Sequence, residues 1–178
     1  MSESKNMKKN IKIFVSYAKA NKEAKADFLK RFKDYAGADS KFKFEFWIDE
    51  QLAVGKDWDE SIHKALAECD FGILLLSPAF LQSSYIAQNE LPLLVQKPLV
   101  FPVALAPIDF KRHDLKGLLA KQIFRLDAPK LDKPRAFTEL KPKRRDEFVM
   151  QLYEQMHDQL ATYLDSDNKS TKPSSQKD

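Results

Sequence analysis

An uninterrupted apolar run, Phe71–Leu76, lies near the middle of the chain and reads Phe-Gly-Ile-Leu-Leu-Leu. A strand with one face in solvent alternates apolar and polar side chains, whereas a strand covered on both faces is apolar throughout. The run therefore predicts an interior strand of a parallel sheet, with helices packed on both faces of that sheet.

Helix-like segments separate this run from other strand-like segments. Strand patterns occur at residues 11–16, 42–48, 71–76, 99–105 and, more weakly, 122–126. Such alternation predicts a doubly wound, flavodoxin-like α/β fold with right-handed crossovers and helices on both faces. Residues 42–48 alternate in polarity, as an edge strand does. We therefore expect a five-stranded parallel sheet in the order 2-1-3-4-5.

The length of 178 residues suits a single domain. We expect this domain to span residues 10–164, after a flexible basic segment at 1–9. Residues 165–178 are rich in Ser, Lys and Asp and have nothing to bury, so we expect a disordered hydrophilic tail there. An alternative is a domain excised from a longer protein, whose missing part senses a signal.

Glycine, cysteine and histidine exclude several kinds of site. The four glycines are Gly37, Gly55, Gly72 and Gly117, and no two are close. A glycine-rich turn or loop that cradles phosphates is therefore excluded. Cys69 is the only cysteine, which excludes an intrachain disulfide and a cysteine-built zinc site. The three histidines lie far apart, so we expect no metal and no cofactor.

The charge distribution does not indicate a nucleic-acid partner. The net charge is +4, but the lysines are spread along the chain among 26 acidic residues. No apolar run approaches the roughly 20 residues of a membrane span, and no signal-peptide core follows the N-terminus. We therefore expect a cytoplasmic protein that binds neither nucleic acid nor membrane.

The expected strand order places a ligand crevice at the carboxyl edge of the sheet, between the first and third strands, where the winding reverses. The residues at these strand ends are Ser16, Tyr17, Ala18 and Ser77. A phosphorylatable receiver domain has acids at these positions, so that class is excluded. The carboxylate that we place on the helix after the third strand is Glu90.

Each candidate also has a purely structural interpretation. On spacing alone, Glu90 is an ordinary helical glutamate that faces solvent or interacts with the helix dipole. Trp58 is a core anchor, Ser84 a helix cap and Tyr85 a packing residue with an exposed hydroxyl. Spacing favours these interpretations over functional ones.

Several short motifs, taken together, resemble the TIR (Toll/interleukin-1 receptor) domain family. They are Phe-Val-Ser-Tyr at 14–17, Asp49 with Gly55, Trp58, Ile62 and Ala65, and Ile-Leu-Leu-Leu-Ser-Pro at 73–78 with Ser84-Tyr85 and Glu90-Leu91. They occur in the family's order and spacing over about residues 10–126. Each motif alone is weak, but all of them in register are a specific signal.

The resemblance implies one of two functions. Some TIR domains are scaffolds that recruit other TIR domains, and others cleave the nicotinamide–ribose bond of NAD+. Enzymatic members carry a glutamate on the helix after the third strand, and Glu90 matches it. The loop at 49–55 lacks the Arg and Pro that are usual in animal adaptors, which favours the bacterial NAD-cleaving type.

We therefore expect an NAD+ hydrolase or cyclase that acts in signalling or antiviral defence and is activated by self-association, including filaments. NAD+ would be a substrate and not a cofactor. The alternative is a non-enzymatic TIR–TIR interaction module, either a signalling scaffold or a host-mimicking effector.

The resemblance also implies roles for individual residues, with Glu90 as the catalytic residue. The other expected substrate-binding residues are Ser16, Tyr17, Ala18, Asp49, Lys56, Trp58, Ser77, Ser84 and Tyr85. Lys56 or Lys19 would bind the pyrophosphate in place of a glycine cradle.

One departure affects Tyr85. Many family members have an aromatic-Cys pair four residues before the glutamate, whereas Tyr85 lies five residues before Glu90 and Ile86 replaces the Cys. On an α-helix, this offset would rotate Tyr85 by about 100° relative to Glu90.

Overall fold

The computed structural model describes residues 7–48 and 56–171, and the side chains of 56–59 lie outside this description. A parallel sheet forms its centre, with strands β1 (Lys9–Tyr17), β2 (Phe42–Ile48), β3 (Phe71–Leu76) and β4 (Val100–Ala104). Their order is β2-β1-β3-β4, so β1 and β3 are adjacent at the switch point. The predicted parallel α/β fold is confirmed for these four strands.

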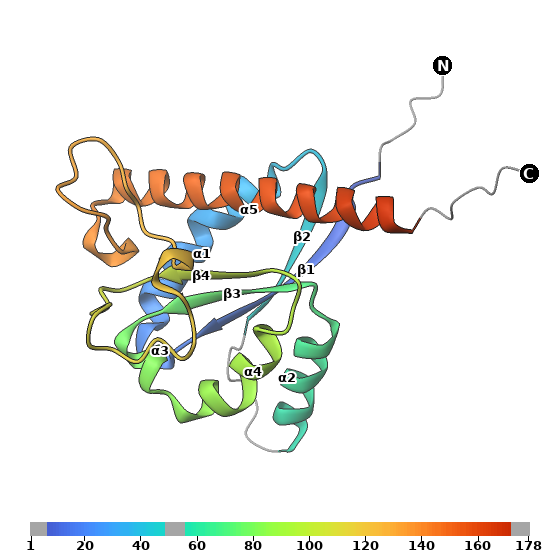
Figure 1. Cartoon of the computed structure of the whole chain (residues 1–178), viewed down its shortest axis with the longest axis horizontal. Coiled ribbons are helices and arrows are strands. Elements are labelled where there is room, and N and C mark those ends of the chain that lie inside the picture. The colour runs from blue at the N-terminus through green and yellow to red at the C-terminus, as the bar shows by residue number, and fades with distance from the viewer. Residues whose placement is uncertain (1–6, 49–55, 172–178) are drawn as a thin grey trace, which may run out of the picture.

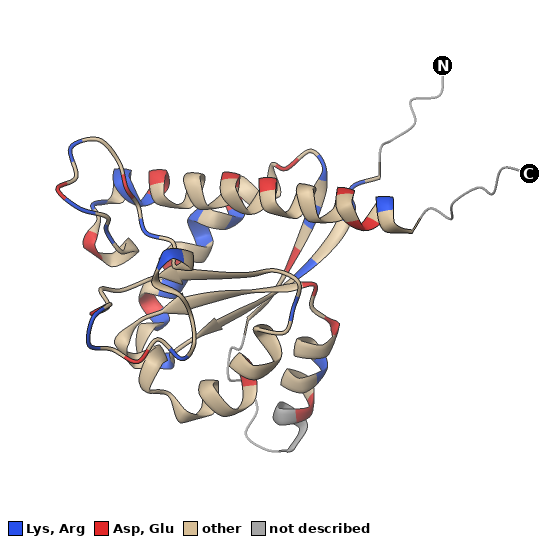
Figure 2. Cartoon of the chain, in the orientation of Figure 1, with Lys and Arg blue, Asp and Glu red and all other residues tan. Residues whose placement is uncertain are grey.

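Helices cover both faces of the sheet (Figure 1). Helices α1 (Lys22–Gly37) and α5 (Pro142–Ser170) pack on one face, and α2 (Lys56–Glu68) and α4 (Leu91–Leu94) pack on the other. The shorter helical segments are η1 (Lys19–Asn21), α3 (Pro78–Gln82), η2 (Ile86–Glu90), η3 (Ala120–Gln122) and η4 (Phe137–Glu139). Charged side chains lie mainly on the helices and loops around the sheet (Figure 2).

Strand β3 contributes to both cores, as its apolar run predicts. Ile73 and Leu75 belong to the core beneath α1 and α5, and Leu74 and Leu76 to the core beneath α2 and α4. At Gly72, an added Cβ would lie 2.8 Å from Cδ2 of Leu94, so glycine permits the close approach of α4 to β3.

The predicted fifth strand at 122–126 is wrong as a strand. Phe124 forms a single parallel bridge with Val103, and Leu126 bridges Arg135 in the antiparallel direction. The Phe124 N–H donates to the Pro102 carbonyl at 2.8 Å, so the backbone polar groups of position 102 face this outer edge. Proline has no N–H to donate there, which interrupts the pairing.

The C-terminal helix is longer than the sequence predicts. The expected boundary at residue 164 falls inside α5, which continues to Ser170. In this last part, the Ser166 hydroxyl donates to the Thr162 carbonyl, while Leu160 is the last buried residue of the helix. The backbone thus remains helical after its apolar face has ended. None of the helices within the described ranges is long and apolar enough to cross a membrane.

A buried carboxylate, Asp39, joins the start of β2 to α5. Its Oδ1 accepts hydrogen bonds from the N–H groups of Lys41 and Phe42, both at 2.7 Å. Its Oδ2 accepts one from the Tyr153 hydroxyl at 2.5 Å and lies 2.6 Å from Nδ1 of His157. Burial disfavours the charged form, but hydrogen bonds from Tyr153, from the backbone and from His157 outweigh it and hold the pKa of Asp39 below its ordinary value.

We predict that Asp39→Asn lowers the free energy of unfolding by about 3 kcal/mol near neutral pH, because an amide group then faces hydrogen-bond donors. Since the folded-state pKa of Asp39 is lowered, its contribution is present above its ordinary pKa and is lost as the pH falls through the lowered value. Denaturant unfolding across acidic pH should therefore show a weaker pH dependence in the variant. The exposed Asp34→Asn is the control, and an equal loss in both variants would contradict the assignment.

Candidate active site

The carboxyl edge of the sheet contains a buried pair, Ser16 and Glu90. Ser16 lies near the end of β1, and its hydroxyl donates a hydrogen bond to Oε2 of Glu90. Their exposed fractions are 1% and 2%, respectively. The interpretation of Glu90 as a solvent-facing glutamate is therefore wrong. A carboxylate is seldom buried without partners, since burial disfavours its charge.

Strand alternation explains how Ser16 meets Glu90. Phe14 and Ala18 pack in the core beneath α2 and α4, and Ser16 lies between them in the period-two pattern. Glu90 ends the π-helical segment η2 and immediately precedes α4, so it approaches the same face. The N–H of Leu91 donates to the Ile86 carbonyl, five residues earlier, which identifies the π turn.

A second polar contact joins the ends of β1 and β3. The Ser77 hydroxyl donates to Oδ1 of Asn21 at 2.5 Å and accepts from the N–H of Phe80 at 3.0 Å. It thereby caps α3, whose first residue is Pro78. Ser77 is fully buried. The predicted switch point is thus held by side chains that follow both strands.

Lys25 is a polar residue near this edge that sequence reasoning missed. It lies in the first turns of α1, is 3% exposed, and its Nζ is 4.6 Å from the centre of the Tyr17 ring. The spacing of Lys25 in the sequence could have predicted its burial. Lys25 precedes Phe28 by three residues and Leu29 by four, so it shares their buried face of the helix. An ammonium group over an aromatic face is a favourable cation–π arrangement.

The other predicted site residues differ in how deeply they are buried. Ala18 is buried, and Tyr85 is partly buried against the core beneath α2 and α4. Ser84 is exposed, and Ser83 instead accepts a hydrogen bond from the Ile86 N–H at 3.3 Å, so Ser84 is not the helix cap. Asp49 and the side chains of Lys56 and Trp58 lie outside the described residues.

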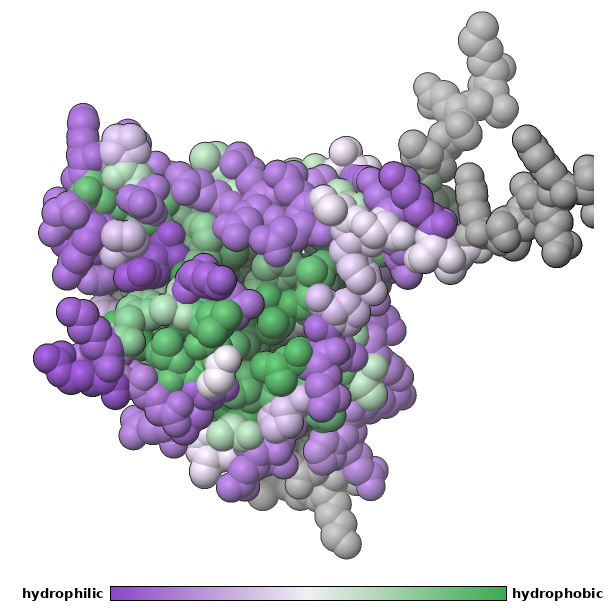
Figure 3. Space-filling view, in the orientation of Figure 1, coloured by the Kyte–Doolittle hydropathy of each residue, from purple (hydrophilic) through white to green (hydrophobic). Residues whose placement is uncertain are grey.

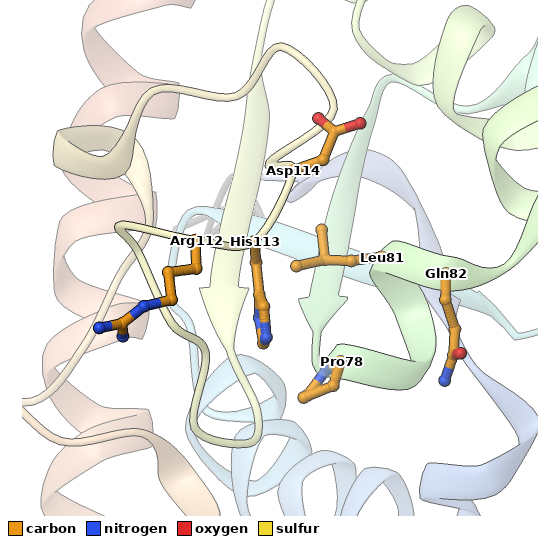
Figure 4. Close-up of a pocket in the computed structure, with 6 residues that line it drawn as sticks. All are labelled: Pro78, Leu81, Gln82, Arg112, His113 and Asp114. Atoms are coloured by element: carbon orange, nitrogen blue, oxygen red, sulfur yellow. The ribbon is translucent and has the colours of Figure 1, made fainter.

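A cavity of about 340 Å³ lies beside α3 at the same edge. Its lining residues are Pro78, Leu81, Gln82, Arg112, His113 and Asp114 (Figure 4). The last three follow β4, in a loop whose helical and strand signals are weak, so sequence reasoning did not select them. Arg112 pairs with Asp109 at 2.7 Å. Among the described residues, no group of His, Cys, Asp or Glu could hold a metal ion.

These features define a doubly wound parallel α/β domain with a buried carboxylate at its switch point. More specifically, the family model described as TIR domain matches residues 13–141, and the chain belongs to this family. No curated protein and no solved structure matches the chain.

We predict that Ser77→Ala lowers the free energy of unfolding by about 1–2 kcal/mol, because α3 loses its N-cap and Asn21 its partner. The exposed Ser84→Ala is the matched control and should change stability by less than about 0.5 kcal/mol. Chemical denaturation of both variants measures the difference. Equal stabilities would contradict the capping role.

Proposed function

We propose that this TIR domain cleaves the nicotinamide–ribose bond of NAD+ and that Glu90 is its catalytic carboxylate. One observation carries the proposal, namely the burial of Glu90 at the switch point with the Ser16 hydroxyl donating to it. A buried ionisable group at the ligand-binding edge of such a sheet is a functional-site candidate.

The chemistry needs a negative charge beside the ribose. The bond between the ribose C1′ and the pyridinium nitrogen breaks, and its electron pair leaves with neutral nicotinamide. The ribose is left with oxocarbenium character, as in glycoside hydrolysis. Water then adds at C1′ and releases a proton, which gives ADP-ribose, or an adenine nitrogen adds, which gives a cyclic isomer. A carboxylate that interacts more strongly with the cationic ribose than with the ground state lowers the barrier.

The surrounding residues supply the remaining groups in this proposal. Ala18 follows β1 and packs in the core beneath α2 and α4, on the face of the sheet that Glu90 approaches, and it remains a candidate for the floor of the crevice. Tyr17 instead packs against the core beneath α1 and α5, on the opposite face, so its expected place in the floor beside Glu90 is not supported. Lys19 is exposed at the start of η1, and Lys56 begins α2, so both remain candidates for binding the pyrophosphate. We keep Asp49 and Trp58 as candidates for the border of the crevice.

Self-association is the second part of the proposal. TIR domains generally interact with one another, and this chain exposes apolar side chains that a second copy could cover. Figure 3 shows apolar surface gathered over β4, between α5 and α4. The exposed fractions of Leu93, Val95 and Leu119 are 41%, 46% and 53%. This surface also favours the alternative function, a non-enzymatic interaction module in signalling or defence.

We predict that Glu90→Gln lowers the rate of nicotinamide release from NAD+ by about 10²–10⁴, because the amide has similar size but no charge. Chromatography of free nicotinamide measures the rate, and thermal unfolding checks the fold. The exposed Glu154→Gln should retain the wild-type rate. A Glu90→Gln protein with near wild-type turnover would remove Glu90 from the catalytic role. No nicotinamide release from the wild-type chain, even at high concentration, would favour the interaction module.

We predict that specific activity rises with protein concentration, since one copy then completes the crevice of another. The measurement is nicotinamide release across a hundredfold dilution series, with light scattering in parallel. Leu119→Asp should flatten the dependence and lower the activity, whereas Met7→Asp, at an exposed position before β1, should not. Full activity from a strictly monomeric protein at all dilutions would exclude this mechanism.

A further inference from the structure

We propose that the π turn Ile86–Glu90 is a register correction that directs Glu90 at Ser16, which makes the turn a positioning device for the carboxylate. The effect on catalysis rests on the proposed function. The helical register that places Glu90 opposite Ser16 is a property of the fold and does not depend on that function. It also accounts for the extra residue between Tyr85 and Glu90.

Three apolar anchors fix the helical stretch on both sides of Glu90. Ile86, Leu91 and Leu94 have exposed fractions of 4%, 6% and 0%, and all three belong to the core beneath α2 and α4. On a regular α-helix each residue turns by about 100°, so Leu91 would lie about 140° from Ile86. A turn closed by an i→i+5 hydrogen bond holds one more residue, which brings Leu91 back towards Ile86. Glu90, between them in the sequence, then also faces the core.

Pro92 marks where the wide turn ends. In a regular α-helix, residue 92 would donate its N–H to the Gln88 carbonyl, but proline has no N–H and its ring clashes with that carbonyl. Beyond this point, the Val95 N–H donates to the Leu91 carbonyl, which restores the α-helical spacing. The Asn89 side-chain amide donates to the Tyr85 carbonyl at 3.1 Å and gives this part of the wide turn a further hydrogen bond.

The π turn also changes the expectation for Tyr85. A turn closed by an i→i+5 hydrogen bond holds more residues than an α-helical turn, so a five-residue separation brings Tyr85 and Glu90 closer to the same side than α-helical spacing would. The π turn therefore offsets the rotation of about 100° between Tyr85 and Glu90 that was expected for an α-helix. Tyr85 packs against the same core as Ile86, which agrees with this register.

The register can be tested with two variants that change the length of the turn by one residue in opposite directions. The first deletes the exposed Gln88 and carries Pro92→Ala, which permits a regular α-helix with all three anchors in place. The second inserts one alanine after Gln88, which turns Glu90 away by about 100°. Nicotinamide release should stay within about tenfold of wild type in the first variant and fall at least about 100-fold in the second. A folded but inactive deletion variant, or a fully active insertion variant, would overturn the proposal.

A second readout does not depend on activity. Ser16→Ala is combined with each length variant and with Glu90→Leu, which removes the acceptor, and the unfolding equilibrium constant is measured by denaturation. We expect Ser16→Ala to change this constant about tenfold more in the wild-type and deletion backgrounds than in the insertion and Glu90→Leu backgrounds. A general structural role for Ser16 would give the same effect in all four backgrounds, which overturns the proposal. If the insertion variant fails to fold, the deletion background decides, because loss of the Ser16→Ala effect there, down to the level seen with Glu90→Leu, would also overturn the proposal. If the stability pattern holds while no protein releases nicotinamide, the register proposal stands and the proposed enzymatic function fails.

Discussion

The burial of β3 on both faces is the constraint from which the rest of the structure follows. A strand with apolar side chains on both faces must be covered by helices on each side, and in a parallel sheet those helices are the connections between strands. The side chains of Ile73 and Leu75 pack beneath one layer of helices, and those of Leu74 and Leu76 pack beneath the other. Because β1 neighbours β3, the carboxyl ends of these two strands meet at one edge. Polar residues that follow them are thus brought together.

Buried polar side chains at both ends of the sheet are paired, because a polar group that is removed from water without a partner costs stability. At the carboxyl edge the Ser16 hydroxyl donates to Glu90, and at the other edge Asp39 accepts from Tyr153 and backbone N–H groups. The two carboxylates differ in their surroundings. Asp39 is held by several donors that stabilise its charge, which suits a structural anchor. Glu90 lies on the helical stretch at the switch point, where ligands of such sheets bind.

Elements that have a local sequence pattern could be predicted from the sequence. Features that depend on tertiary contacts could not. The apolar run of β3, the edge pattern of β2 and the order of four strands follow from periodicity. The fifth strand fails because Pro102 interrupts pairing on a neighbouring strand, which the pattern of 122–126 does not reveal. Lys25 was overlooked although its spacing from Phe28 places it on the buried face of α1. The π turn was unpredictable from spacing, because a periodicity argument assumes a constant 100° per residue, and the choice between α and π depends on which side chains the core accepts.

The proposed chemistry explains why a carboxylate would be retained in such an unfavourable place. Burial strengthens the interaction of Glu90 with any nearby charge, since there is little solvent to screen it. In the free protein, burial of the carboxylate costs stability, and hydrogen bonds such as the one from Ser16 offset this cost. When the ribose develops positive charge, the same burial becomes favourable, and the gain is greatest in the transition state because the charge is greatest there. In the proposed register, the π turn lets Glu90 and its flanking apolar anchors face the core together, where an α-helix of the same sequence would turn one of them away, so the carboxylate is oriented while the anchors remain buried.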